Sequence, residues 1–301
     1  MTGYRSSEYA HSLSEFGLPR ELPGSGGWIL QRQIGGLQLY DAIGCYPIFA
    51  CQDWSQLPAD INNLGDELVS LALVTDPFGN YDQELLRECF PHVCILFKQH
   101  YVIDLNKNPE EFISNHHKRR ARKAFEKVVV RVHPEPLKFV DLWFELYQTL
   151  VKRHHLRGIK AFSREAFARV LCLPGIKVFY VEADQQVIGA HLWLVEGEIA
   201  YSHLTATNPL GYKLMASFAL HWFAIEYFSG LVRWLNLGSG AGLKDKDGNG
   251  LSKFKEGWST GTKPVYFCGR ILNQDKYIEL SQSLHAQDVD YFPLYRRGEF
   301  A

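Results

Sequence analysis

The residues that could do chemistry gather in one stretch near the C-terminus, from Val232 to Trp258. A short apolar run, Trp234 to Leu237, is typical of a buried strand. Glycines follow at positions 238, 240, 242, 248 and 250, with acidic and basic residues between them. Glycine at this density indicates positive φ angles or a backbone that must approach a ligand closely. Because α/β proteins bind ligands in the loops that follow their strands, this stretch is the first candidate for a functional site.

One interpretation of the loop is a calcium site, because Asp245, Asp247, Asn249, Gly250 and Glu256 match the pattern of an EF-hand loop in full. Carboxylate and amide oxygens at alternate positions can surround one hard cation. An EF-hand also needs a helix that enters the loop, and the glycines at 238–242 oppose one. The lysines at 253 and 255 add positive charge beside the metal position. We therefore expect a polar turn that holds no calcium ion and no other metal.

A second interpretation rests on Leu235 to Gly242, which resembles the glycine loop that holds the methionine part of the cofactor in Rossmann-type methyltransferases. Such a loop opens a helix and is followed by further strand–helix units. Here the polar turn 244–249 follows instead, and the sequence ends at residue 301. Since one βαβ unit takes roughly thirty residues, too little chain remains for the rest of such a sheet. The sequence disfavours a methyltransferase.

Composition places the chain among globular proteins. It has 301 residues, of which 46% are hydrophobic, and this is enough apolar material for one large or two ordinary domains. The net charge of −1 argues against a protein that binds polyanions over its whole surface. The six cysteines have no C-x-x-C spacing and lie mostly in apolar runs, as buried thiols of a reducing compartment do. The sequence shows no signal peptide and no apolar run long enough to span a bilayer, so we expect a cytoplasmic protein.

The elements that position the loop become regular after residue 108. The segment 116–128 is expected to be a helix with one apolar face; its other face carries Lys118, Arg119, Arg120, Arg122, Lys123 and Lys127. Such a face is commonly only solvated, and alternatively it binds the phosphates of a cofactor or of RNA. Three strands joined by tight turns are expected at 177–183, 187–195 and 198–205. A long buried helix at 212–229, a strand at 232–237, a strand at 265–272 and a helix at 273–284 complete the chain.

Before residue 108 the pattern alternates between short strands and short helices. Residues 1–27 are polar and rich in turn residues, and strands are expected from Trp28 onward, at 68–74 and at 93–105. Helices are expected at 57–65 and 81–89. This alternation indicates a first α/β unit of roughly one hundred residues.

The order of elements in the second half resembles the core of the GNAT acyltransferase superfamily, and more narrowly its Fem-type (FemAB-like) branch. Three pieces of sequence carry the resemblance: the basic helix that ends in Lys123-Ala124, the strand step Ile188-Gly189-Ala190, and the step Phe254-Lys255 after a glycine-rich turn. The resemblance implies a mixed α/β (α+β) sheet with helices on both faces and two tandem GNAT-like units, at 1–107 and 108–301. It also implies a transferase that moves an acyl or aminoacyl group from a CoA-, carrier- or tRNA-linked donor to an amine.

In such a reaction the attacking amine loses a proton, and the carbonyl oxygen of the donor develops negative charge. Lys255 is the candidate for stabilising that charge, and His203, within a strand, is the candidate base. The competing interpretations are a surface lysine and a structural histidine. We expect Lys255 to point into a cleft beside His203, and Lys253, on the same predicted strand, to face the other way. The candidates for lining the site are Tyr201, Asn208, Gly238 and Trp258.

The segment 207–213 departs from GNAT enzymes that use acetyl-CoA, in which a Q/R-x-x-G-x-G/A loop binds the pyrophosphate at a helix N-terminus. Here only Gly211 matches that loop, with Lys213 as a candidate phosphate contact. Acyl-CoA and aminoacyl-tRNA therefore both stay open as donors. The expected acceptor is the amine of a small molecule or of a cell-wall or glycan precursor, with tRNA as a further partner. The alternative is a degenerate GNAT fold that acts as a non-catalytic binding module.

Overall fold

The computed structural model describes residues 2–154, 158, 161–240, 250–282 and 291–299. Its N-terminal part starts with a 3₁₀ turn, η1 (Gly3–Arg5), and helix α1 (Ser7–Ser12). Five strands and two further helices follow: β1 (Leu18–Leu22), β2 (Gly27–Gln33), β3 (Tyr40–Gly44), α2 (Leu57–Asn63), β4 (Ser70–Val74), α3 (Gln83–Cys89) and β5 (Val93–Asp104). Strand β5 is continuous over most of the strand expected at 93–105, and the polar, turn-rich segment 1–27 contains helical turns at 3–5 and 7–12 as well as β1.

The second part begins with α4 (Pro109–Phe112), the basic helix α5 (Asn115–Phe125) and β6 (Val129–Val132). Helices α6 (Val140–His154) and α7 (Arg164–Val170) come before the predicted meander, which is present as β7 (Ile176–Ala183), β8 (Gln186–Glu196) and β9 (Ile199–Thr207). The chain then forms α8 (Pro209–Lys213), α9 (Ala216–Phe228), β10 (Trp234–Gly238), α10 (Gly250–Glu256), β11 (Gly261–Ile271) and α11 (Gln274–Ser281).

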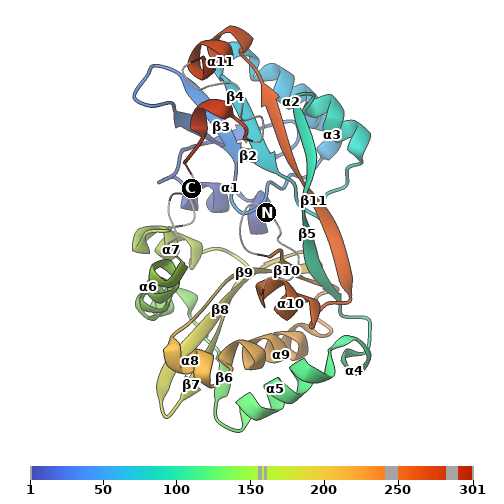
Figure 1. Ribbon diagram of the computed structural model, residues 1–301, viewed down its shortest axis with the longest axis vertical. Helices are drawn as coiled ribbons and strands as arrows, with labels where there is room; N and C mark the ends of the chain where they lie inside the picture. Colours follow the sequence, from blue (N-terminus) through green and yellow to red (C-terminus); the bar gives the residue numbers. More distant parts are fainter. Residues whose placement is uncertain (1, 155–157, 159–160, 241–249, 283–290, 300–301) are drawn as a thin grey trace.

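Within the described residues all eleven strands join in one mixed sheet, in the order β1-β2-β3-β4-β11-β5-β10-β9-β8-β7-β6. Strands β9 and β10 are parallel and are linked through α9, as a strand–helix–strand crossover requires. A helix between two such strands is expected to pack on the sheet that contains both, and this is confirmed, because Ala219, Leu220 and Ala224 of α9 share a core with Ala200 and Leu235. The expected mixed sheet with helices on both faces is also confirmed (Figure 1).

Alternate residues of the meander supply the two faces of its sheet. Val178 and Leu192 join the core beneath α6 and α7, whereas Phe179 and Trp193 join the core beneath α5 and α9. A third core lies at the other end of the molecule, where α2 and α3 cover β2–β4 and β11. Figure 1 shows the two ends as an upper and a lower part, connected by the long strands β5 and β11. No described helix is long and apolar enough to cross a bilayer.

Two larger features also differ from the prediction. The single helix expected at 212–229 is broken into α8 and α9 at Met215, whose φ of 61° is left-handed. Strand β11 lies between β4 and β5, so a C-terminal strand completes the sheet of the N-terminal part. The boundary expected at 107/108 does not account for a C-terminal strand in the N-terminal sheet, because the sequence of a strand does not determine which strand it pairs with.

Candidate functional site

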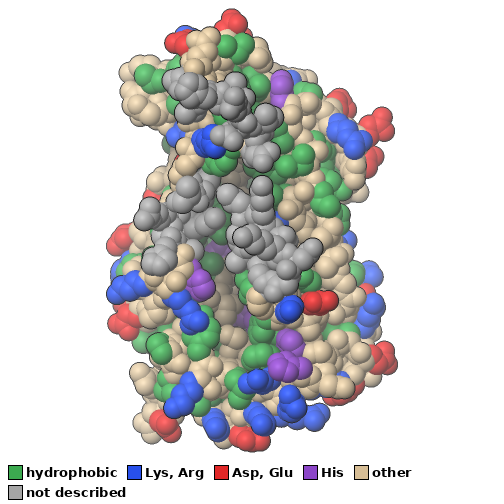
Figure 2. Space-filling view, in the orientation of Figure 1, with side chains coloured by type: hydrophobic (Ala, Val, Ile, Leu, Met, Phe, Trp, Pro, Cys, Tyr) green, Lys and Arg blue, Asp and Glu red, His purple; other side chains and the backbone are tan. Residues whose placement is uncertain are grey.

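The strands β9 and β10 separate partway along their length. They pair from Ile199–Trp234 to Tyr201–Asn236, and beyond that point β9 continues to Thr207 paired with β8 on its other side. Among the described residues no strand pairs with the β10 side of β9 from 202 to 207. The molecule is hollowed on this face between α6–α8 and α9–α10 (Figure 2). A free strand edge inside a hollow can take an extended ligand through backbone hydrogen bonds.

A bulge in β9 lies where the strands separate. Trp193 pairs with Ser202 and Leu192 pairs with Leu204, so His203 has no opposite residue on β8. An extra residue in one strand redirects the side chains next to it. The His203 ring lies under α6 among Tyr4, Tyr9 and Phe162, while the hydroxyl of Ser202 contacts His191 beneath α9.

Ser202 and His191 form the polar pair at this point. The Ser202 Oγ and His191 Nε2 are 2.7 Å apart, within the range of a hydrogen-bonded hydroxyl and base. His191 Nδ1 is buried without a hydrogen-bond partner among the described residues, and the rings of His191 and His221 are 4.9 Å apart. Burial lowers the pKa of His191 far below 6.5 and that of His221 to about 4, so both imidazoles are neutral at neutral pH.

The glycine turn after β10 is held from two sides. Asn236 Oδ1 accepts a hydrogen bond from the Gly238 N–H at 2.9 Å and pairs with His100 Nδ1 at 3.1 Å. Gly238 has a φ of +73°, which a side chain would strain. Two ammonium groups reach the carbonyls that follow: Lys255 Nζ donates to Ser239 at 2.6 Å, and Lys98 Nζ donates to Gly240 at 2.9 Å.

Lys255 belongs to helix α10, and the strand expected for Lys253 and Lys255 is wrong. Helix α10 is attached to α5 through His117, whose Nε2 lies 2.9 Å from the Phe254 carbonyl. Trp258 follows the helix fully buried, 5.0 Å from the His117 ring and 6.0 Å from the His221 ring. Burial lowers the pKa of His100 to about 3, and the charge of Lys255 adds to this lowering and to that of the His191 and His221 pKa values. The lysine therefore acts electrostatically on this group of histidines.

The expected cleft is not formed as predicted. Tyr201 donates to Asp76 Oδ2 at 3.0 Å, and His203 Nδ1 lies 3.0 Å from the Tyr4 hydroxyl, both in the core on the α6 face. Lys255 instead lies with the glycine turn and with the histidines near the α9 face. Because side chains alternate between the two faces of β9, and the bulge changes that alternation, Tyr201 and His203 lie on the face opposite Lys255. The catalytic roles of Lys255 and His203 both stay predictions, as do the binding roles of Tyr201, Gly238 and Trp258.

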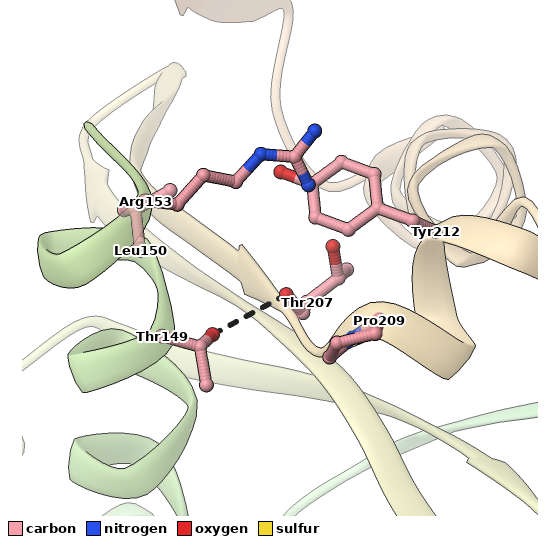
Figure 3. Close-up of a pocket in the computed structure, with 6 residues that line it drawn as sticks. All are labelled: Thr149, Leu150, Arg153, Thr207, Pro209 and Tyr212. Atoms are coloured by element: carbon pink, nitrogen blue, oxygen red, sulfur yellow. Dashed lines mark hydrogen bonds between the residues drawn. The ribbon is translucent and has the colours of Figure 1, made fainter.

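Asn208, Gly211 and Lys213 lie at the far end of β9, in and around α8. Asn208 caps α8 by accepting the Gly211 N–H at 2.8 Å, so that N–H is already used within the chain. Lys213 is exposed in the last turn of the helix. Next to α8 a cavity of about 130 Å³ opens between the α6 and α8 sides (Figure 3); it is lined by Thr149, Leu150, Arg153, Thr207, Pro209 and Tyr212. The Arg153 guanidinium lies over the Tyr212 ring, 4.0 Å from its centre.

Several residues of this site are not apparent in the sequence. His191 and His221 look like core histidines because they stand in apolar segments, and Ser202 and His100 carry no motif. What groups them is the bulge and the pairing of β10 between β5 and β9, which only tertiary structure reveals. Of the calcium pattern, Asp245, Asp247 and Asn249 lie outside the described residues. Within the described part of the chain no group of three or more His, Cys, Asp or Glu side chains could hold a metal ion.

Comparison with known proteins agrees with this architecture. Residues 114–244 match the acetyltransferase (GNAT) domain family. The crystal structure of FemX has 12% identity and a TM-score of 0.65, over 90% of this chain and 92% of that one. A C-terminal domain from Agrobacterium fabrum, named as part of a lysylphosphatidylglycerol synthetase, has 14% identity and a TM-score of 0.64, over 92% and 89%. L-PGS from Bacillus licheniformis has 12% identity and a TM-score of 0.59, over 90% and 93%. No curated protein matches the chain.

Proposed function

We propose that this protein transfers an acyl or aminoacyl group to an amine, because residues 114–244 match the acetyltransferase (GNAT) domain family and 90% of the chain has a fold similar to that of FemX. The observation that carries the proposal is the polar group beside the open edge of β9, in which Ser202 and His191 are hydrogen-bonded and the charge of Lys255 acts on His191. Neutral hydrogen-bonding groups and one positive charge suit a carbonyl that becomes an oxyanion.

In the proposed reaction the amine nitrogen attacks the carbonyl carbon of the donor. A C–N bond forms, the C–O or C–S bond to the carrier breaks, and the amine loses a proton that the leaving oxygen or sulfur gains. We assign the charge of Lys255 to the developing oxyanion or to a phosphate of the donor. We assign the proton transfer to the Ser202 hydroxyl supported by His191, in place of His203, whose Nδ1 is already engaged with Tyr4.

The surroundings of α8 bear on the choice of donor. Since the Gly211 N–H is donated to Asn208, it is not available to a pyrophosphate as in GNAT enzymes that use acetyl-CoA. The exposed cations of α5, at Arg119, Arg120, Arg122 and Lys123, and Lys127 just after it lie on the lower end of the molecule, where blue side chains gather (Figure 2). Among the donors kept open, these features support an aminoacyl-tRNA over an acyl-CoA. A donor of that kind and a cell-wall or glycan-precursor amine are consistent with a cytoplasmic protein.

The test is a transfer assay with the natively purified protein. Mass spectrometry of molecules that co-purify with it identifies candidate donors and acceptors, which are then offered in pairs. We expect a new amide product whose rate falls about a hundredfold in Ser202→Ala, a loss typical of a proton-transfer group. The melting temperature should fall by only a few degrees, because His191 loses its hydrogen-bond partner. Bound ligand without any product from any pair would favour the second candidate, a non-catalytic binding module, which the engaged Gly211 N–H also suits.

A further inference from the structure

A second cavity lies on the opposite end of β9, between the N-terminal part and the meander. It has a volume of about 370 Å³, within the range of small-molecule sites. It is bounded by η1, by the loop after β4, by the turn between β8 and β9, and by the start of β10. The side chains relevant to its chemistry are Asp76, Glu196, Phe78, Trp234, Tyr201 and Arg5.

Asp76 is the polar centre of the cavity. Its side chain is buried, with Oδ1 accepting from the Phe78 N–H at 3.0 Å and Oδ2 accepting from the Tyr201 hydroxyl at 3.0 Å. These two bonds fix the carboxylate but carry no positive charge. The ion pairs among the described residues do not include Asp76, and the nearby guanidinium of Arg5 is bonded to Glu196. A buried carboxylate that faces a cavity without a cation partner is a costly feature that a cationic ligand would relieve.

The walls beside Asp76 are aromatic. The Phe78 and Trp234 rings are 5.8 Å apart, and Phe78 also lies 6.2 Å from Tyr201. The chain itself already places a cation over two of these rings, since Lys263 Nζ is 4.9 Å from the centre of Phe78 and 5.7 Å from that of Trp234. Ring faces of this kind attract ammonium groups through their quadrupole.

The charges of the residues that line the cavity also favour a cationic ligand. Asp76, Glu196 and Glu198 line the cavity against the single guanidinium of Arg5 among its lining residues. We propose that this cavity binds the protonated amine of a small organic cation, with its ammonium group on Asp76 and its apolar stem against Phe78 and Trp234. The proposal does not rest on the transferase activity, because it concerns a different cavity and predicts binding alone.

Binding is measured by isothermal titration calorimetry at pH 8 and low ionic strength, where Asp76 is ionised, with n-pentylammonium and 1-pentanol as matched probes. We expect saturable binding of one pentylammonium per chain, at least about tenfold tighter than pentanol. This comparison uses the wild-type protein, so it stands even where a variant fails to fold. Equal affinity for the two probes, or no saturable binding of pentylammonium, would overturn the proposal.

Two variants locate the site. Asp76→Asn keeps the shape and one acceptor oxygen, and it should remove the preference for the ammonium probe over the alcohol. Trp234→Leu removes one wall and should weaken pentylammonium several-fold. Glu84→Gln on α3, an exposed carboxylate outside the cavity, is the control and should bind as the wild type does. Ammonium selectivity that persists in Asp76→Asn would place the binding elsewhere and refute the assignment.

Discussion

Lys253 and Lys255 stand two residues apart on α10 and differ in their surroundings. Lys255 is half-buried and donates to the Ser239 carbonyl, whereas Lys253 is exposed. If Lys255 stabilises the transition state, Lys255→Ala should lower kcat/KM about a hundredfold or more, because one such contact contributes a few kcal/mol. Its melting temperature should fall by only a few degrees, since a half-exposed charge adds little stability. Steady-state kinetics and thermal unfolding measure the two effects.

Lys253→Ala is the matched control for that experiment. It removes the same charge from the same helix and should retain activity within about threefold. Equal losses in the two variants would indicate a general electrostatic effect of α10 and would remove Lys255 from the site.

Asp76 gives the protein a measurable pH dependence of stability. Burial is the main cause that raises its pKa from 3.8 to about 7. Between those values the folded protein keeps a proton that the unfolded chain has released, so this residue's contribution to the free energy of unfolding is present at low pH and lost as the pH rises towards 7. Three pKa units correspond to at most about 4 kcal/mol.

The buried histidines act in the opposite direction, because a lowered pKa makes stability decrease as the pH falls below about 6.5. The effect of Asp76 is therefore isolated by subtracting the unfolding free energy of Asp76→Asn from that of the wild type. Urea denaturation measures both values. We expect this difference to be larger at pH 4.5 than at pH 8. A difference that does not change with pH would show that Asp76 titrates normally in the folded protein.

At the scale of elements, the sequence predicted what hydrophobic period and turn chemistry determine. The meander β7–β9 and helix α9 follow from strand alternation, tight polar turns and a long apolar segment. The same rules misassigned Lys253 and Lys255 to a strand, since a short polar segment after glycines has no clear period. They also could not show the bulge at His203, because one extra residue in a strand depends on its partner's register.

The sequence likewise predicted only part of the candidate site. The glycine turn and Lys255 stand out in the sequence, and the structure brings them into contact. His191, Ser202 and His100 reach the same place from β8, β9 and β5, and no local pattern connects these strands. Asp76 likewise becomes notable only once burial and the contact with Tyr201 are known.

Helix α8 packs so closely on β8 that Gly211 admits no side chain. A Cβ at this position would lie 2.4 Å from the Ile188 carbonyl oxygen, a backbone atom that cannot turn away. Gly211→Ala should therefore lower the free energy of unfolding by about 2–3 kcal/mol, as overpacking against a fixed group does. Gly261→Ala is the control, because its Cβ would meet nothing within 4 Å, and it should change stability by less than about 0.5 kcal/mol. Chemical denaturation compares them, and equal stabilities would mean that α8 can shift freely.

At the scale of the whole molecule, strand β11 joins the two parts of the chain. It pairs with β4 over Phe267–Ile271 and with β5 over Gly261–Gly269, so residues near the C-terminus fill the middle of the N-terminal sheet. Figure 1 shows β5 and β11 running together from the upper part to the lower part. The two units at 1–107 and 108–301 remain a proposal about ancestry and activity, but this topology makes the first one incomplete by itself.

A fragment of residues 1–107 tests this dependence. Without β11, strand β4 loses its partner opposite β3, and β5 loses both of its neighbours, β11 and β10. Unpaired strand edges with apolar faces aggregate, so we expect the fragment to be insoluble or to lack a cooperative unfolding transition. Co-expression with residues 108–301 should restore a soluble complex, because the missing strand is then supplied in trans. Size-exclusion chromatography and circular dichroism measure both results. A soluble fragment 1–107 that unfolds cooperatively alone would show that β11 is an addition to a sheet that is already stable, and the first unit would then be an independent domain.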